Sequence, residues 1–411
     1  MEITDKTNLP LNGVRIVDWS IRATGPSATA LLADMGAEVI KVETLDGGDP
    51  DRGASKDATA KLTLPNGLPY NFLTNNRNKK SIAVDLTKEE GKQIIYSLVA
   101  NADIFVQNFR YGVAKKLKMD YETLQKHNPS LVYANCTGYG RKGKQVTQSA
   151  MDATIHGASG LMLGIGEPDM PPIAIPGAIN DQVTALMLVN GIMIALFHRE
   201  RTGEGQEINV AMLGTMIWVQ KNNLLTTILA KKARPRQLRS KPSNPLVNHY
   251  RCQDGLWIVL GMFQVDKYWS ALCRALGLNE LIDDPRFNKA KGKEQHSAEL
   301  VSLLDKAFAS KTRPEWISIF QAADLLYSPV RDYWEVVNDP DVLENGFIVE
   351  YDYPGLGKIK DIGIPIELSK TPGSIRETAP QLGQHTEEIL IELLGYSWED
   401  IQNLQGKSVI L

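Results

Sequence analysis

The chain has 411 residues, more than the roughly 250–300 residues at which a single hydrophobic core stops growing, so we expect two domains. Hydrophobic residues make up 43% of the sequence and charged residues 23%, which excludes a disordered or low-complexity protein. The 45 basic and 48 acidic residues leave a net charge of −3, which argues against a nucleic-acid binder, because such proteins carry a strong basic excess.

Cysteine usage fits a reducing cytoplasm best, and the sequence predicts neither a metal site nor a membrane segment. Three cysteines without a CxxC motif provide neither a disulfide framework nor a cysteine zinc site. Six histidines show no HExxH or paired-ligand spacing, so we expect no metal site. No signal peptide is readable at the N-terminus. The longest apolar stretch, 183–197, is too short for the ~20 residues that span a bilayer, so we expect no membrane anchor.

The first part of the chain alternates between strand and helix patterns. Short β-branched stretches predict strands, and apolar residues three or four positions apart predict helices. The expected strands are 14–19, 38–42, 81–86, 103–107 and 131–136. The expected helices are 27–35, 88–102 and 121–126. Repeated strand–helix–strand units indicate an α/β fold with a mostly parallel sheet that is covered on both faces.

The middle of the chain loses this alternation. The stretch 181–201 is apolar on nearly every side and predicts a buried helix, and a strand is expected at 207–211. A basic stretch with prolines, 230–245, indicates a linker or an exposed excursion. The remaining expected elements are a hairpin at 250–260, helices at 265–276, 297–309 and 314–322, a β-rich stretch at 347–368, and helices from Thr386 and from Ser397.

The motifs that usually accompany such a sheet are absent from the sequence. No GxxxxGK[ST] loop occurs, and the turn after the first expected strand, 21–26, is not GxGxxG. The absence of these motifs argues against ATP hydrolysis and against a standard NAD-binding site. The glycine and serine pattern at 157–160 is not the GxSxG nucleophile elbow.

Asp181 stands where the apolar helix is expected to begin. One interpretation is an N-cap, because aspartate is among the best capping residues. The other is a carboxylate nucleophile that the positive end of the helix keeps ionised, with Gly177 leaving room for a substrate. The two interpretations are compatible.

Several separated motifs follow one another in order along nearly the whole chain, at 11–18, 25–26, 32–43, 78–86, 107–110, 202–206 and 383–386. Together they resemble the motifs of CoA-transferase family III, the CaiB/BaiF type. The resemblance implies that Asp181 attacks the thioester of an acyl-CoA donor and forms an acyl-aspartyl anhydride and then an aspartyl-CoA thioester. A carboxylic acid then accepts CoA by the reverse steps. One thioester replaces another, which agrees with the missing ATP loop. Acyl-CoA is thus expected as a substrate, with no tightly bound cofactor.

Two other functions stay open. An α-methylacyl-CoA racemase of this family pairs the aspartate with a histidine thirty residues earlier, but that position is Met151, which cannot move a proton. His156 is the nearest substitute, although a packing role suits it better. The other alternative is a non-catalytic CoA-binding subunit of a heteromer, against which the presence of Asp181 argues.

The resemblance also implies where CoA is bound. Ala23 and Thr24 match the loop nearest the thioester. The wall that holds the adenosine is matched by Leu86, Thr87, Asn108 and Phe109, and Lys116 matches a residue that faces the nucleotide phosphates. Lys116 also belongs to a lysine run typical of a solvated surface, and the alternative for Phe109 is a core position. Binding is favoured for Asn108 and Phe109, because ligands sit at the strand ends of parallel sheets.

Departures from the family pattern put the acid specificity in doubt. They are Tyr111 for a common proline, Ala23 where some members carry glutamine, and Met151 with Asp152 where some have Tyr-Glu. The glycine-rich lid of some members is not evident at 245–250, so we expect a different loop to close the site.

The expected architecture follows from the pattern and the resemblance together. Residues 1–225 and 340–411 are assigned to a large Rossmann-like, CoA-binding domain, and 226–339 to a smaller α+β domain with linkers. The resemblance further implies an interlocked, ring-like homodimer, with a heteromer containing a related subunit as the alternative.

Overall fold

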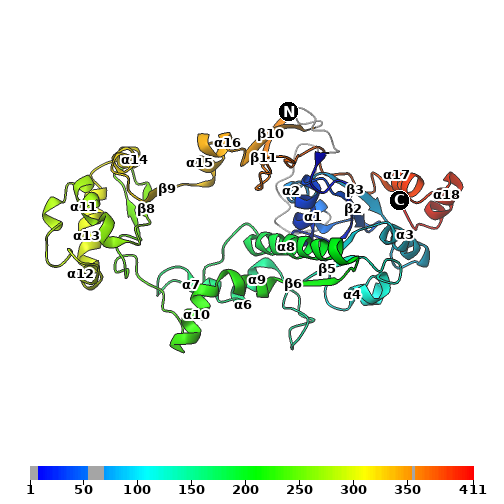
Figure 1. Ribbon diagram of the computed structural model, residues 1–411, viewed down its shortest axis with the longest axis horizontal. Coiled ribbons are helices and arrows are strands. Elements are labelled where there is room, and N and C mark those ends of the chain that lie inside the picture. Colours follow the sequence, from blue (N-terminus) through cyan, green and yellow to red (C-terminus); the bar gives the residue numbers. More distant parts are fainter. Residues whose placement is uncertain (1–7, 54–68, 354–356) are drawn as a thin grey trace. The chain divides into compact units, whose positions relative to one another are not determined.

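The computed structural model describes residues 8–53, 69–353 and 357–411 (Figure 1). Its contacts divide the chain into two compact units. The first comprises Met1–Leu161, Ala174–Leu225 and Glu344–Leu411, and the second Met162–Ile173 and Thr226–Leu343. The short segment Met162–Ile173, which the sequence analysis placed in the large domain, makes its contacts with the second unit. The assignment of CoA binding to the large domain stays a prediction.

The first unit is built on a six-stranded parallel sheet with the strand order β3-β2-β1-β4-β5-β6. The strands are β1 Arg15–Trp19, β2 Glu38–Glu43, β3 Lys79–Ala83, β4 Ile104–Gln107, β5 Val132–Thr137 and β6 Glu207–Ala211. This sheet confirms the predicted mixed α/β fold. The order is that of a doubly wound sheet, in which the direction of winding reverses between β1 and β4.

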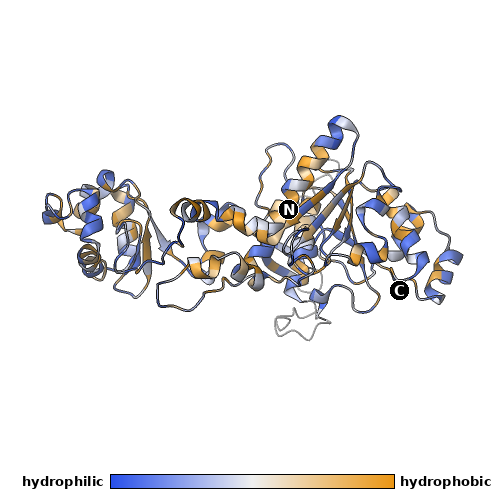
Figure 2. Ribbon diagram, turned by 90° about the horizontal axis from the view of Figure 1, so that it is seen from below, coloured by the Kyte–Doolittle hydropathy of each residue, from blue (hydrophilic) through white to orange (hydrophobic). Residues whose placement is uncertain are grey.

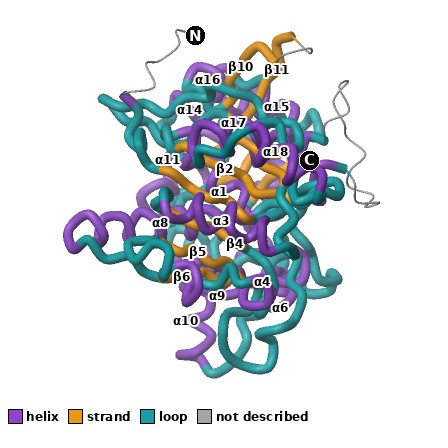
Figure 3. Tube along the Cα trace, turned by 90° about the vertical axis from the view of Figure 1, so that its right-hand side faces the viewer, coloured by secondary structure: helices purple, strands orange, loops and turns teal. Residues whose placement is uncertain are grey.

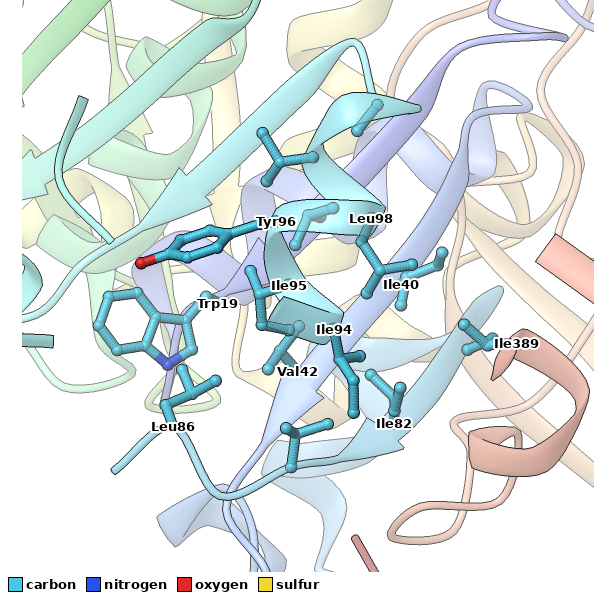
Figure 4. Close-up of a cluster of buried hydrophobic side chains, with 14 of the residues drawn as sticks. Trp19, Ile40, Val42, Ile82, Leu86, Ile94, Ile95, Tyr96, Leu98 and Ile389 are labelled. Carbon is cyan, nitrogen blue, oxygen red and sulfur yellow. The ribbon is translucent and has the colours of Figure 1, made fainter. Parts of the chain in front are cut away.

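Alternate residues of the strands face opposite sides of the sheet, and helices cover both sides. Ile16 and its neighbours contribute to the cluster beneath α1 (Thr24–Asp34) and α8 (Ile179–Thr202). Val17 contributes to the other cluster, beneath α3 (Glu89–Ala100). Figure 4 shows side chains of α3 packed toward strand residues such as Val42 and Ile82. Two-sided burial explains why the strands read as continuous apolar runs.

Further elements complete the first unit. They are α2 Tyr70–Asn76, α4 Val113–Leu117, α5 Tyr121–Leu124, α6 Asp152–Ala158, α9 Met212–Val219, the antiparallel hairpin β10 Ile348–Tyr353 and β11 Gly357–Ile362, α17 Thr386–Glu388, a π-helical turn Ile389–Leu393 and α18 Trp398–Gly406. Two helices contain a boundary between the units, α7 Leu161–Gly164 and α10 Lys221–Ala230. Figure 3 shows β4, β5 and β6 with α8 and α9 beside them.

The second unit has a core of its own. A three-stranded antiparallel sheet is formed by β7 His249–Arg251, β8 Trp257–Leu260 and β9 Tyr327–Val330. The helices are α11 Val265–Leu276, α12 Ala290–Gln295, α13 Ser297–Phe308, α14 Arg313–Ala322, α15 Tyr333–Val337 and α16 Pro340–Glu344. Tyr250 of β7 stacks on Phe308 of α13 with ring centroids 4.7 Å apart. In Figure 2 the helices carry both hydrophobic and hydrophilic residues, as expected for helices that cover a core.

Helix α8 corrects one expectation. Only one of its faces is buried within the chain, and the side chains of Leu186, Ile194 and Phe197 are 50%, 68% and 64% exposed. Its 24 residues and an 18-residue window with mean hydropathy 1.4 would also suffice to cross a bilayer, so the estimate of length from the sequence was too short. Core helices meet the same criterion, and the buried face of α8 packs against α1 and the sheet.

Candidate active site

A cavity of about 360 Å³ lies at the carboxyl ends of β1 and β4, where the winding of the sheet reverses. This is the position at which doubly wound sheets bind ligands. The residues that line it are Ile21, Arg22, Ala23, Thr24, Asn108, Phe109, Arg110, Tyr111, Val113, Cys136, Thr137, Gly138, Val146, Gln148, Ala150, Met151, Asp181 and Met212. Five of the predicted site residues therefore meet at one cavity: Ala23, Thr24, Asn108, Phe109 and Asp181.

Asp181 lies in the first turn of α8, but it is not the N-cap. The cap position is Ala178, in the left-handed conformation with φ 54°, so the capping interpretation was wrong. The Oδ1 atom of Asp181 instead accepts a hydrogen bond from the hydroxyl of Thr24 at 2.7 Å. The carboxylate is thereby tied across the cavity to the start of α1.

The capping role belongs to Asp152, which the sequence analysis noted only as a departure from the family pattern. Its Oδ1 atom accepts the backbone N–H groups of Asn180 at 2.8 Å and of Asp181 at 3.3 Å. Asp152 begins α6, far from α8 in the sequence, so no local capping pattern could reveal it. A carboxylate at this helix end satisfies N–H groups that otherwise lack partners.

Several neighbours act on the Asp181 carboxyl. Burial raises its pKa, the hydrogen bond from Thr24 lowers it, and the negative charge of Asp152 raises it again. His156 and Arg22 lower it. The net direction is upward, so the carboxylate is more basic than an exposed aspartate.

Met151 lines the cavity, whereas His156 does not. Met151 cannot exchange protons. His156 is fully buried and lies with Nδ1 3.5 Å from Oδ2 of Asp152. Neither ring nitrogen of His156 makes a hydrogen bond within the part of the chain that the structure describes.

The side chain of Asn108 holds the loop that follows β1 with two hydrogen bonds. Its amide oxygen accepts the N–H of Ile21 at 2.9 Å, and its amide nitrogen donates to the carbonyl of Ile21 at 2.8 Å. A Cβ at Gly25 would lie 2.4 Å from the Cβ of Ser20, so the chain can return this closely only with glycine there. The loop between β1 and α1 is thus held in place from both sides.

Beneath this loop lies a network of buried charges. Lys41 pairs with Asp49 at 2.8 Å and donates to the carbonyl of Ser20 at 3.0 Å, while Lys79 pairs with Asp18 at 2.9 Å. All four charged side chains are fully buried. Burial lowers the pKa of Lys79 to about 8 despite the adjacent Asp18. Lysines inside otherwise apolar strands were the sequence signal for this network, because buried charges need partners.

The other predicted binding residues lie outside the cavity lining. Leu86 is buried in the cluster that also contains Trp19, whose ring lies 4.2 Å from the ring of Phe109. Thr87 is exposed and donates its hydroxyl to Asp85 at 2.6 Å. Lys116 is exposed on α4. Phe109 therefore connects the cavity with the Leu86 cluster, whereas Thr87 and Lys116 are surface residues.

No group of three or more histidine, cysteine, aspartate or glutamate side chains with metal-binding geometry occurs among the described residues. The charged side chains that line the cavity are Arg22, Arg110 and Asp181. Apart from them, the lining consists of apolar, hydroxyl, thiol and amide groups. The cavity can thus bind an anionic ligand and present one carboxylate to it.

Comparison with known proteins identifies similar chains. Residues 11–386 match CoA-transferase family III. The succinyl-CoA:glutarate CoA-transferase of Mus musculus is 33% identical over 401 residues, which cover 98% of this chain and 90% of that protein. The (R)-2-hydroxy-4-methylpentanoate CoA-transferase of Clostridioides difficile is 28% identical, over 97% of this chain and 99% of that protein. The crystal structure of a CaiB/BaiF family protein from Brucella suis superimposes with a TM-score of 0.81 at 30% identity, covering 94% of this chain and 100% of that chain.

Proposed function

The chain belongs to CoA-transferase family III and is a CoA-transferase, and we propose that it moves CoA from an acyl-CoA to a free carboxylic acid through covalent intermediates on Asp181. The observation that carries this proposal is the position of the Asp181 carboxylate on the wall of the cavity at the β1 and β4 strand ends. The hydrogen bond from Thr24 occupies Oδ1. Oδ2 is then the oxygen that attacks the thioester.

The proposed reaction conserves charge and bonds at each step. An oxygen of Asp181 attacks the carbonyl carbon of the acyl-CoA, the C–S bond breaks, and CoA leaves as a thiolate with a mixed anhydride remaining on the enzyme. The thiolate attacks the aspartyl carbonyl, the anhydride C–O bond breaks, and the donor acid leaves as a carboxylate. The acceptor carboxylate attacks the resulting aspartyl-CoA, and the steps run in reverse. Covalent catalysis thus divides one exchange into easier steps.

The surroundings of Asp181 suit a nucleophile. An ionised carboxylate is the attacking species, and the hydrogen bond from Thr24 favours that form, while burial makes it more basic. The N–H groups at the start of α8 are already accepted by Asp152, so they hold the turn that carries Asp181 rather than an oxyanion. Thr24, with Ala23 beside it, is the group that faces the reacting atoms.

The racemase alternative lacks its second base. Met151 takes the place where the resemblance expects a histidine, and the buried His156 does not line the cavity. Two-base proton transfer needs two groups within reach of one carbon atom. The geometry therefore favours transfer over racemisation. A non-catalytic subunit stays possible only if Asp181 is never acylated, which the experiment below tests.

The binding assignments follow the same proposal. We assign the adenosine end of CoA to Asn108, Phe109, Leu86 and Thr87, and its phosphates to Lys116. The tilted ring contact between Phe109 and Trp19 supports an aromatic wall at this place. CoA enters as a substrate, and no tightly bound cofactor is part of the mechanism. We propose a homodimer, with a heteromer that contains a related subunit as the alternative. The proposed location is the cytoplasm, in keeping with three free cysteines.

Asp181 can be tested directly by trapping the adduct. Wild-type protein incubated with succinyl-CoA is expected to gain the mass of an acyl or CoA adduct on the peptide that contains Asp181, and hydroxylamine is expected to remove it. Asp181→Asn keeps the side-chain shape but lacks the nucleophile, and should lose the adduct and at least about 10³-fold in transfer rate. The exposed Asp169→Asn is the matched control and should retain both. Full transfer by Asp181→Asn would overturn the mechanism.

A further inference from the structure

The backbone of Arg22 is held in an uncommon conformation beside the reacting carboxylate. Its φ angle is 63°, in the left-handed region that residues other than glycine seldom adopt. Such strain persists only where the surrounding structure enforces it, and it gathers at functional sites. Arg22 lies in the loop between β1 and α1 and lines the cavity together with Asp181.

A buried ion pair enforces this conformation. The backbone N–H of Arg22 is directed at both carboxylate oxygens of Asp49, at 3.0 Å and 3.2 Å. Asp49 is in turn paired with Lys41, which also holds the carbonyl of Ser20. Both charged side chains are fully buried. The buried pair of Lys41 and Asp49 thus fixes the backbone of Arg22, and with it the direction in which the Arg22 side chain begins, although burying two charges costs free energy.

The positive charge of Arg22 acts on the reacting carboxylate. Arg22 lines the same cavity as Asp181, and its charge lowers the pKa of that carboxyl. Its guanidinium forms an ion pair with Asp51 at 3.7 Å, and 36% of the side chain is exposed. Burial and the adjacent Asp49 raise the pKa of Asp51 to about 6, so Asp51 is still largely ionised at neutral pH and a substrate carboxylate would share the guanidinium with it.

An arginine at this place discriminates between acyl groups. The acyl carbon of the donor must sit against Asp181, so the remainder of the acyl group extends within reach of the nearby charge. An apolar chain there offers no acceptor to the guanidinium, whereas a second carboxylate provides a charge-assisted, two-point acceptor. The other arginine of the lining, Arg110, follows β4 rather than β1 and belongs to the side on which we placed the adenosine.

We propose that Arg22 binds the distal carboxylate of the acyl group, so that the site selects dicarboxylic acids and their CoA thioesters over monocarboxylic ones. This inference rests on the proposed function, because it takes the acyl carbon to be placed at Asp181. Family membership does not supply it, since relatives are named for acids as different as glutarate and a branched hydroxy acid. Arg22 thus determines the specificity of the site for the acyl group.

The test compares two donors of equal chain length, succinyl-CoA and butyryl-CoA, in the half-reaction that forms the adduct without an acceptor. Wild-type protein should prefer succinyl-CoA. Arg22→Asn should lower kcat/KM for succinyl-CoA by roughly 10- to 100-fold and leave butyryl-CoA within about threefold. Asparagine is chosen because it tolerates the left-handed backbone. Arg22→Lys keeps the charge without the two-point geometry and should retain part of the preference.

Arg110→Asn, the other arginine of the lining, is the matched control and should change both donors equally, leaving their ratio unchanged. Circular dichroism checks that each variant is folded. An unchanged donor ratio in Arg22→Asn, or a wild-type protein without preference, would overturn the proposal. Calorimetric Kd values for the two donors separate it from the proposed mechanism. If Arg22→Asn abolishes tighter binding of succinyl-CoA while no adduct forms in any protein, Arg22 keeps its role and only the covalent route fails.

Discussion

One hydroxyl group decides which oxygen of Asp181 is available. Thr24 donates to Oδ1 at 2.7 Å, and no hydrogen bond to Oδ2 occurs within the described part of the chain. A donor to the charged form of a carboxyl lowers its pKa, which opposes the effect of burial. Thr24 therefore keeps the nucleophile ionised and oriented. It acts on Asp181 rather than on the substrate alone.

Replacing Thr24 by valine, which has the same shape without the hydroxyl, is expected to raise the pKa of Asp181. Less of the carboxyl is then ionised, so the acid limb of the kcat profile should move to higher pH. At neutral pH kcat should fall about 10-fold, because hydrogen bonds to charged groups contribute roughly 1.5–3 kcal/mol. Thr24→Ser retains the donor and should behave like wild type. A profile of Thr24→Val that coincides with that of wild type would show that the hydroxyl does not act on Asp181.

At the scale of elements, α8 shows what a sequence can and cannot reveal. Its apolar run and the glycine at its end predict its existence, and the helix was found at Ile179–Thr202. Its start was misread, because the cap comes from the side chain of Asp152 in another helix. Contacts between residues far apart in the sequence leave no local pattern. Strand β9 was missed for a different reason. It contains Pro329, and proline argues against a strand unless the strand lies at the edge of a sheet, which the sequence alone does not show.

Replacing Asp152 is expected to shift the pKa of Asp181 in the opposite direction to replacing Thr24. Removing its negative charge in Asp152→Asn should lower the pKa of Asp181, so the acid limb of the kcat profile should move to lower pH. The asparagine oxygen can still accept the N–H groups of α8, so stability should change little. Asp152→Ala should lose about 1 kcal/mol of unfolding free energy, as expected for a lost cap.

The two Asp152 variants are distinguished by measuring denaturant unfolding beside the pH profile. The control is Asp169→Asn, an exposed aspartate that touches neither helix end. If Asp152→Asn moved the acid limb upward, like Thr24→Val, the repulsion between the two carboxylates would not be the operative effect. If Asp152→Ala unfolded like wild type, the N–H contacts of α8 would contribute nothing to stability.

For the whole molecule, the alternation of strands and helices predicted the parallel sheet, but not its order. The order places the loops after β1 and β4 side by side, and this brings Thr24, Asn108 and Asp181 to one cavity. Asp181 could be singled out from the sequence because it stands where an apolar helix begins and because the family resemblance marks this position. Arg22 could not, because its importance lies in a backbone conformation and in a buried pair, Lys41 and Asp49, that only the folded chain brings beneath it.

The proposed homodimer accounts for the apolar surface that the single chain leaves uncovered. Ile194 and Phe197 of α8 are more than half exposed, and Trp218 of α9 is 59% exposed. Large apolar side chains that are exposed on two helices in contact with each other are typical of an interface. If a second copy covers this surface, placing a charge in its centre must weaken association, because a charged group loses its hydration when it is buried.

Phe197→Asp is therefore expected to raise the dissociation constant of the dimer by at least roughly 10- to 100-fold, which is the range for a central interface residue. Light scattering after size-exclusion chromatography, across a dilution series, measures it. Glu200→Ala on the same helix, already exposed and polar, should leave the mass at that of wild type. An interlocked dimer would also resist exchange between labelled and unlabelled protomers, because separation requires threaded chains to come apart. A monomeric wild-type protein with full transfer activity would refute the dimer, and rapid exchange in a stable dimer would refute the interlocking alone.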